Sequence, residues 1–364
     1  LYSIGNDITV AQGSGKQPSR YDRTKPLNAL GNSYLCADDK WLLLGVASAA
    51  DAWKRFREIV DDDTWMDDPA FATDALRRDN VEQLVRTLET EFSKHPRAEW
   101  GERLARAGIN WNPIASAGDA TNDPQIDACG TFRDGCVETP LFFAFPRPSR
   151  AEPLSALPFD PAAWRSPGHL DPAAPESGDT RPLDGLRVID TSHYVAGPAL
   201  GGLLVDLGAE VVKVEPPGGD PRRGALPHLV DGDPPGLNRS YHMDNRGKRS
   251  VEVDFSDADQ LAKLKSLIAD SDIFITNLLP QRQAKYGLTA ADVLALNAQA
   301  TYASLTAHGS TGPDAHQGGF DLTAFFARSG ILGALTEQNG VPPRSRSGQG
   351  DHIATLVLLT GTLA

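Results

Sequence analysis

The stretch PLDGLRVIDTSHYVAGPALGGLLVDLGAEVVKVEPPGGD, residues 182–220, decides the fold. Its pattern predicts a strand over residues 186–190, a helix over 197–207 and a second strand over 210–215. Two parallel strands joined by a crossover helix form a βαβ unit, with which a parallel sheet begins. Because this unit lies in the middle of the chain, the residues before it need an explanation of their own.

The residues after this unit continue the alternation of strands and helices. Strands are predicted at 250–254, 272–276 and 301–305, and helices at 257–269 and 290–296. Such alternation is typical of a doubly wound parallel sheet. We therefore expect an α/β fold with a Rossmann-like sheet domain over residues 182–364.

The first half of the chain predicts a different, smaller unit. Residues 32–46 have the pattern of a β-hairpin, and amphipathic helices are expected from Ser48 onward, at 80–92 and at 97–107. These elements predict a small α+β domain over residues 28–145. Residues 1–27 are polar and lack periodicity, which indicates an arm or loop, and the Pro- and Ala-rich residues 146–181 indicate a linker.

Composition excludes several classes of function. The 364 residues are 40% hydrophobic and 23% charged, and the net charge of −13 disfavours nucleic acid as a partner. No apolar run is long enough to cross a membrane. The three cysteines and eight histidines show no spacing typical of a disulfide framework or a metal site. They indicate reduced thiols, a cytoplasmic location and no metal.

The glycine-rich turn over residues 196–202 opens a helix, where free N–H groups favour a phosphate. A dinucleotide site is one interpretation, but no GxGxxG follows the strand and Pro198 lacks an amide hydrogen. A tight strand-to-helix turn without a ligand remains the alternative.

Several motifs in fixed order resemble the N-terminal part of the family III CoA-transferases. They are residues 182–220, Arg223-Gly224, 245–254, Asn277, 286–288, 302–304, 309–313 and 319–321. Residues 28–44, 67–73, 97–100, 107–114 and 122–125 resemble the C-terminal part of the same family. The order is therefore reversed, through either a tandem fusion of two members or a circular permutation. Leu1 in place of Met and the apolar end at 354–364 favour an excerpt of a tandem fusion.

The resemblance implies an enzyme that moves CoA from an acyl-CoA to a carboxylic acid through a covalent aspartyl intermediate. The matching nucleophile is Asp351, within Ser347-Gly-Gln-Gly-Asp-His352, just before the last predicted helix. Glycines before it would permit close approach of a ligand, and helix amides would stabilise developing negative charge. The alternative is that Asp351 only caps this helix.

The resemblance also implies the CoA contacts and the assembly. The matching CoA-binding residues are His193, Val195, Ala196, Arg223, Val253, Asn277, Leu278, Lys285 and Tyr286. Acyl-CoA and a carboxylic acid are the expected partners, in a homodimer or an intertwined tandem pair. An α-methylacyl-CoA racemase would need a proton-accepting histidine where this chain has Phe320. A non-catalytic scaffold half of a fused enzyme is a further alternative.

Overall fold

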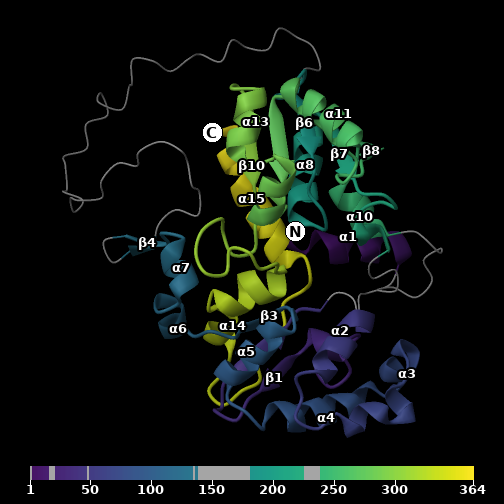
Figure 1. Cartoon of the computed structure of the whole chain (residues 1–364), viewed down its shortest axis with the longest axis vertical. Coiled ribbons are helices and arrows are strands. Elements are labelled where there is room, and N and C mark those ends of the chain that lie inside the picture. Colours follow the sequence, from purple (N-terminus) through teal and green to yellow (C-terminus); the bar gives the residue numbers. More distant parts are fainter. Residues whose placement is uncertain (1, 16–20, 47–48, 134–135, 138–180, 225–237) are drawn as a thin grey trace.

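The computed structural model describes residues 2–15, 21–46, 49–133, 136–137, 181–224 and 238–364. A parallel sheet with its helices forms the upper part of the molecule in Figure 1, and a smaller sheet with helices α2 to α5 forms the lower part.

Five parallel strands form the larger sheet, in the order β10-β9-β6-β7-β8. They are β6 (Arg187–Asp190), β7 (Glu210–Glu215), β8 (Arg249–Glu252), β9 (Ile273–Thr276) and β10 (Thr301–Ser304). The chain moves outward from β6 to β8 and then returns to β9 on the other side of β6. In open α/β sheets, ligands bind outside the carboxyl ends of the strands at such a reversal, which here lies between β6 and β9.

Helices cover both faces of this sheet. On one face, α8 (Ala196–Asp206) and α15 (Gln349–Leu363) pack over an apolar cluster that includes Val188, Leu200 and Ile275. On the other, α11 (Ala258–Ala269) and α13 (Ala290–Leu296) pack over Phe274 and its neighbours. The predicted strands and helices of this region are confirmed, β7 and α13 with the predicted bounds.

The smaller unit contains the antiparallel sheet β1-β2-β3, with β1 (Ser33–Leu35), β2 (Trp41–Leu44) and β3 (Trp111–Pro113). Helices α2 (Ala49–Arg57), α4 (Val81–Phe92) and α5 (Arg97–Arg106) enclose an aromatic core with this sheet. Its centre includes Tyr34, Phe92 and Trp100, and the rings of Tyr34 and Phe92 stack at 4.7 Å. The predicted hairpin and amphipathic helices are therefore confirmed.

Short elements connect these bodies. They are η1 (Tyr2–Ile4), η2 (Ala29–Gly31), η3 (Thr64–Asp67), η4 (Pro69–Phe71), α3 (Asp74–Asp79), α6 (Ala117–Thr121), α7 (Pro124–Ala128), β4 (Phe132–Arg133), β5 (Cys136–Val137), α9 (Pro221–Gly224), α10 (Arg239–Asp244), α12 (Pro280–Tyr286), η5 (Asp321–Arg328) and α14 (Ile331–Leu335). Residues 146–180 of the predicted linker lie outside the described residues.

The prediction of an arm or loop over residues 1–27 is wrong for its first part, where Gly5–Ser14 form helix α1. This helix packs against α10, and the η1 turn before it packs against α15 (Figure 1). Its sequence, GNDITVAQGS, has no continuous apolar stripe, so periodicity does not reveal it. Contacts with residues more than 200 positions away stabilise it instead.

The two halves of the chain also meet at η5, which is wound as a π-helix. Phe326, Ala327 and Leu332 pack with Leu43 and Ile114 of the small unit. Arg328 adds a pair of 2.7 Å hydrogen bonds to Asp123. The domain boundary predicted at residue 181 places η5 in the sheet domain. The apolar face of η5 nevertheless contacts the small sheet.

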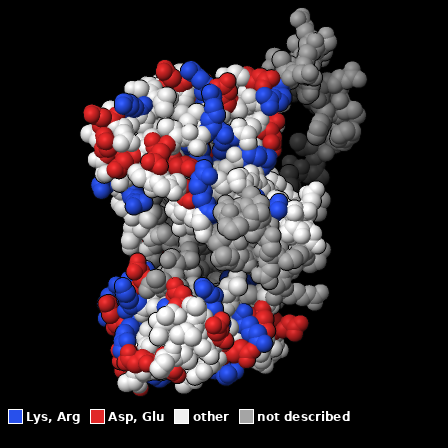
Figure 2. Space-filling model, turned by 90° about the vertical axis from the view of Figure 1, so that its right-hand side faces the viewer, with Lys and Arg blue, Asp and Glu red and all other residues white. Residues whose placement is uncertain are grey.

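Charged side chains are distributed over both parts of the molecule. On the face shown in Figure 2, Lys and Arg are interspersed with Asp and Glu. In the part of the chain that the structure describes, no helix is long and apolar enough to cross a membrane.

Candidate active site

The turn between β6 and α8 rests on a buried ion pair. Lys248 Nζ lies 2.9 Å from Asp190 Oδ2 at the end of β6, and both side chains are buried. Asp190 also accepts hydrogen bonds from the backbone N–H and the hydroxyl of Ser192. Burial by itself would raise the pKa of Asp190, but Lys248 and Lys213 lower it to about 2. The carboxylate therefore fixes the first residues of the turn.

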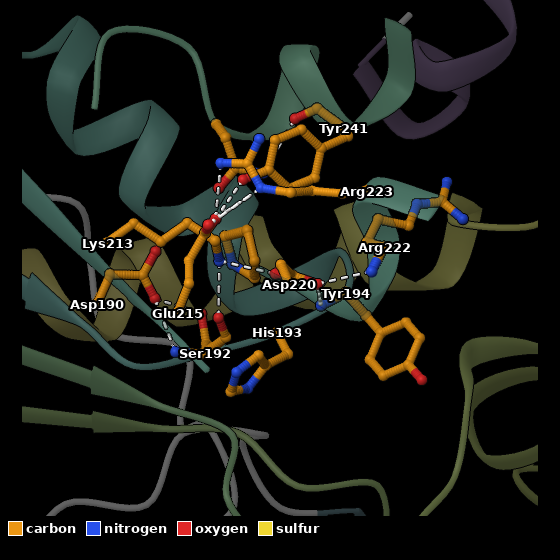
Figure 3. A network of polar contacts seen from close by, with 12 residues as sticks. Asp190, Ser192, His193, Tyr194, Lys213, Glu215, Asp220, Arg222, Arg223 and Tyr241 are labelled. Atoms are coloured by element: carbon orange, nitrogen blue, oxygen red, sulfur yellow. Dashed lines mark hydrogen bonds and ion pairs between the residues drawn. The ribbon is translucent and has the colours of Figure 1, made fainter. Parts of the chain in front are cut away.

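A second buried ion pair holds the other side of the same turn. Lys213 Nζ donates to Ser192 O at 2.8 Å and lies 2.9 Å from Asp220 Oδ2. Asp220 Oδ1 in turn accepts the N–H of Arg222 at 2.8 Å. Figure 3 shows the contacts that join Lys213 to Ser192 and Asp220, and Asp220 to Arg222. The turn is thus tied to the loop that follows β7.

Tyr194 adopts a left-handed backbone conformation in the middle of this turn, with φ +68°. Such a conformation is unfavourable for a residue with a bulky side chain, and it recurs at functional sites. The Tyr194 ring points away from the Lys213 network in Figure 3 and packs edge-on against Phe320 at 5.4 Å. Phe320 therefore has a packing role here.

Asp351 lies in the first turn of α15, whose N-cap is Gly348 with φ +85°. The sequence predicted it just before this helix, which is wrong by one turn. Its alternative role as a helix cap is not observed either, because the N-cap position belongs to Gly348. The helix is fixed beside the β6–α8 turn, since Thr355 Oγ1 donates to Ala196 O at 2.8 Å.

Two other aspartates at the same helix position show what is unusual about Asp351. Asp119 and Asp292 each accept the backbone N–H of their N-cap residue at 3.0 Å and complete capping boxes. Among the described residues, neither a hydrogen bond nor an ion pair involves the Asp351 carboxyl group. We call the Asp351 carboxyl group uncommitted, because it has no hydrogen-bond or ion-pair partner among the described residues.

Asp321 binds two of the backbone amides at the start of α15. Its Oδ2 accepts the N–H of Gly348 at 2.8 Å and of Gly350 at 3.2 Å. The intervening amide of Gln349 donates to Arg346 O. A second carboxyl group therefore already binds two of these amides, and stabilisation of developing negative charge by the other helix amides stays a prediction.

Burial and neighbouring charge set the protonation of Asp351. Burial raises its pKa well above the ordinary value, and the carboxyl groups of Asp321 and Asp244 raise it further. Arg222 is the cation that opposes this effect. Two close carboxyl groups cannot both ionise readily, so Asp351 and Asp321 favour a state with a shared negative charge. Asp351 therefore ionises less readily here than an aspartate in water does.

Arg222 and Arg223 are adjacent but have different surroundings. Arg223 donates to Glu215 at 3.0 Å and lies over the Tyr241 ring at 4.5 Å. Arg222 is buried and donates to Ser240 Oγ at 3.0 Å, and its Nε has no hydrogen-bond partner among the described residues. Figure 3 shows the two side chains pointing in opposite directions. The arginine whose charge acts on Asp351 is therefore Arg222.

The sequence profile described as CoA-transferase family III matches residues 1–162 and 183–364. The chain belongs to CoA-transferase family III.

Individual relatives carry names of this class. A cinnamoyl-CoA:phenyllactate CoA-transferase of Clostridium sporogenes is 35% identical over 185 residues, 50% of this chain and 44% of the relative. A succinate–glutarate CoA-transferase of Agrobacterium fabrum is 38% identical over 167 residues, 45% of this chain and 42% of the relative. A crystal structure of Rv3272 from Mycobacterium tuberculosis is 36% identical with a TM-score of 0.47, covering 50% of each chain. The chain thus spans less than half the length of these two relatives.

The residues predicted to bind CoA in this family III member lie around the carboxyl ends of the parallel strands. Asn277 after β9 accepts the N–H of His193 at 3.0 Å and donates to His193 O at 2.7 Å. Val195 and Ala196 are buried where α8 begins. The bonds between Asn277 and His193 join the segments that follow β6 and β9. Burial lowers the pKa of His193, which favours its neutral form.

The remaining predicted CoA contacts form a second group. Val253 and Leu278 are buried in one apolar cluster, against which Tyr286 packs. Lys285 is exposed and lies over the Tyr286 ring at 5.2 Å. Arg223 is 43% exposed despite its bond to Glu215. Contact of any of these residues with CoA stays a prediction.

Sequence reasoning did not assign a role to Arg222 or Asp321. The neighbouring residues Arg222 and Arg223 look alike in the sequence, and the burial of Arg222 and its side-chain bond to Ser240 show which one turns inward. Asp321 was noted within Gly319-Phe-Asp321, but its capping of α15 joins residues 27 positions apart. In the described part of the chain, no group of three acidic, histidine or cysteine side chains has the geometry of a metal site.

Proposed function

We propose that this protein transfers CoA from an acyl-CoA to a carboxylic acid, with Asp351 as the nucleophile. The observation that carries this proposal is the uncommitted Asp351 carboxyl group beside the β6–α8 turn, at the carboxyl edge of the parallel sheet. Membership of family III and relatives named as CoA-transferases support the reaction class.

The covalent steps follow from the chemistry of a carboxylate. Ionised Asp351 attacks the thioester carbonyl, the C–S bond breaks, and CoA leaves as a thiolate from an acyl-aspartyl anhydride. The thiolate then attacks the aspartyl carbonyl and releases the first carboxylic acid as its carboxylate. The acceptor carboxylate attacks the carbonyl of the resulting aspartyl-CoA thioester, the C–S bond breaks, and a second anhydride, between Asp351 and the acceptor, forms as the thiolate leaves. The thiolate then attacks the acceptor carbonyl of this anhydride, and Asp351 leaves as its carboxylate while the acceptor acyl-CoA forms. Because only ionised Asp351 attacks, its raised pKa makes the rate increase with pH across the acid range.

We further propose that CoA lies along the carboxyl edge of a Rossmann-like sheet. The reversal of strand order between β6 and β9 supports this position. Lys285 and Arg223 are exposed cations that suit the nucleotide phosphates, and the apolar residues Val195 and Leu278 suit the pantetheine arm. A bound CoA that protects neither cation from modification would contradict this placement.

We infer that the chain joins a C-terminal-half-like part to an N-terminal-half-like part. Two separate matches to one family profile support a fusion, and a circular permutation is the alternative. The two parts of such a protein would form a homodimer or an intertwined tandem pair in the cytoplasm. The molar mass of the native protein, by light scattering, and the length of its polypeptide test this arrangement.

Trapping the intermediate tests the function directly. The protein is incubated with acyl-CoA and then with hydroxylamine, and the peptide containing Asp351 is analysed by mass spectrometry. We expect a hydroxamate on Asp351 and no CoA transfer by Asp351→Asn. Asp292→Asn is the matched control, because Asp292 occupies the same helix position but is committed to a cap. Full activity of Asp351→Asn contradicts the proposed mechanism, and a wild-type chain that forms no adduct favours the scaffold alternative.

A further inference from the structure

Helix α1 brings a buried carboxamide to the Asp351 site. Asn6 is only 7% exposed, and neither its Nδ2 nor its Oδ1 has a hydrogen-bond partner among the described residues. Buried amides are rarely left unpaired, because losing water without a compensating hydrogen bond is costly. An unpaired amide that persists in a fold therefore points to a ligand that satisfies it.

The side chain of Asn6 lies directly against the N-terminus of α15. A Cβ placed on Gly348 would lie 2.5 Å from Asn6 Nδ2 and 3.9 Å from Val195 Cγ1. The carboxamide nitrogen thus sits beside the N-cap of α15, on the side where the β6–α8 turn approaches it. Gly348 lies one turn before Asp351, so Asn6 borders the candidate nucleophile.

Three backbone amides at the start of α15 are already bound, so they are not free to donate to a reacting group. Attack on a thioester places negative charge on the carbonyl oxygen, and enzymes stabilise it with preorganised N–H donors. The amides of Gly348 and Gly350 are bound by Asp321, and that of Gln349 by Arg346 O. The neighbouring side chain of the turn, Val195, has no donor. Asn6 Nδ2 is a donor at this position with no partner in the described structure.

We propose that Asn6 is a catalytic residue that donates a hydrogen bond from Nδ2 to the carbonyl oxygen of the acyl thioester. When the Asp351 carboxylate forms its bond to the carbonyl carbon, the π electrons move to that oxygen, which Asn6 stabilises. They return as the C–S bond breaks and CoA leaves as a thiolate. This role rests on the proposed function, and it makes one site from residues near both ends of the chain.

Kinetics of Asn6 variants test this role. Removing one donor of this kind costs about 10²–10³-fold in kcat. We expect Asn6→Ala to lose about that factor in kcat with little change in KM. Asn6→Asp keeps the shape but adds a carboxylate near Asp351, so it should also move the acid limb of the kcat/KM profile to higher pH. Because this variant is isosteric, it keeps the test valid if Asn6→Ala fails to fold.

Asn112→Ala is the matched control, because Asn112 is 3% exposed and its Nδ2 also lacks a partner, but it lies in the small sheet. It should keep the wild-type kcat. Circular dichroism melting curves show the folded fraction of each variant. The role of Asn6 is overturned if its variants have the same kcat as Asn112→Ala and if their pH profiles do not move. The proposed function would remain intact in that case. A wild-type protein without CoA transfer overturns the proposed function, and the role of Asn6 with it.

Discussion

Replacing Lys248 by Met isolates the buried ion pair beneath the candidate site. Lys248 Nζ lies 2.9 Å from Asp190 Oδ2, 2.7 Å from Pro198 O and 3.0 Å from Asn245 Oδ1. The two charged side chains are 2% and 0% exposed. Breaking such a pair leaves an uncompensated buried charge, so the free energy of unfolding should fall by about 3–5 kcal/mol.

The pKa of Asp190 gives a second, lower figure. Its pKa is lowered from 3.8 to about 2, and this difference corresponds to about 2.4 kcal/mol. Because the folded-state pKa is the lower one, this stabilisation is complete above pH 4 and is lost as the pH falls toward 2. In the variant, protonation of Asp190 relieves the uncompensated charge. The difference in stability between wild type and Lys248→Met should therefore narrow as the pH is lowered.

Urea unfolding, followed by far-ultraviolet circular dichroism at pH 7 and pH 3, measures both effects. Arg249→Met is the matched control, because the neighbouring Arg249 pairs with Glu210 at the same 2.9 Å but with side chains 72% and 62% exposed. Exposed pairs contribute less than about 1 kcal/mol. The reasoning is refuted if Lys248→Met loses no more stability than Arg249→Met, or if its loss does not change with pH.

Three further substitutions test the surroundings of the nucleophile. Asp321→Asn removes a charge that raises the pKa of Asp351, so the acid limb of the kcat/KM profile should move to lower pH. Arg222→Met removes the opposing cation and should move that limb to higher pH, in the same assay. Gly348→Ala should lower the melting temperature more than Gly130→Ala does, because both positions have positive φ but only the first would bring a Cβ against another side chain. The φ penalty by itself is about 1–2 kcal/mol, and equal melting temperatures would contradict the clash.

The sequence was sufficient to predict elements that local pattern determines. β7 is an apolar, β-branched run between a glycine turn and a proline pair, and α13 follows a Thr289 cap with Asp292 three positions later. Both have the predicted bounds. The parallel sheet followed from their alternation. In each case the residues that decide the element lie within a few positions of one another.

The candidate site could be predicted only in part, because distant residues determine its chemistry. The motif around Asp351 pointed to the carboxyl group but not to its surroundings. Helix α1 has no apolar stripe, so nothing in residues 1–15 indicated that Asn6 would lie against Gly348. The choice between Arg222 and Arg223 likewise depends on α10, outside the quoted motifs, where Ser240 accepts a hydrogen bond from Arg222 and the Tyr241 ring lies under Arg223.

Competition for the amides of α15 explains why the Asp351 carboxyl group is free. An aspartate in the first turn of a helix normally binds the N-cap amide, as Asp119 and Asp292 do. In α15 the N-cap amide is already bound to Asp321, and that bond requires η5 to pack between the two parts of the molecule. Asp351 is left with a raised pKa, one opposing cation and an unpaired carboxamide nearby. The raised pKa of Asp351 and its lack of a hydrogen-bond partner therefore depend on how the small unit, α1 and the parallel sheet pack against one another. Perturbing η5 should change the pKa of Asp351 even though no residue of the first turn of α15 is altered.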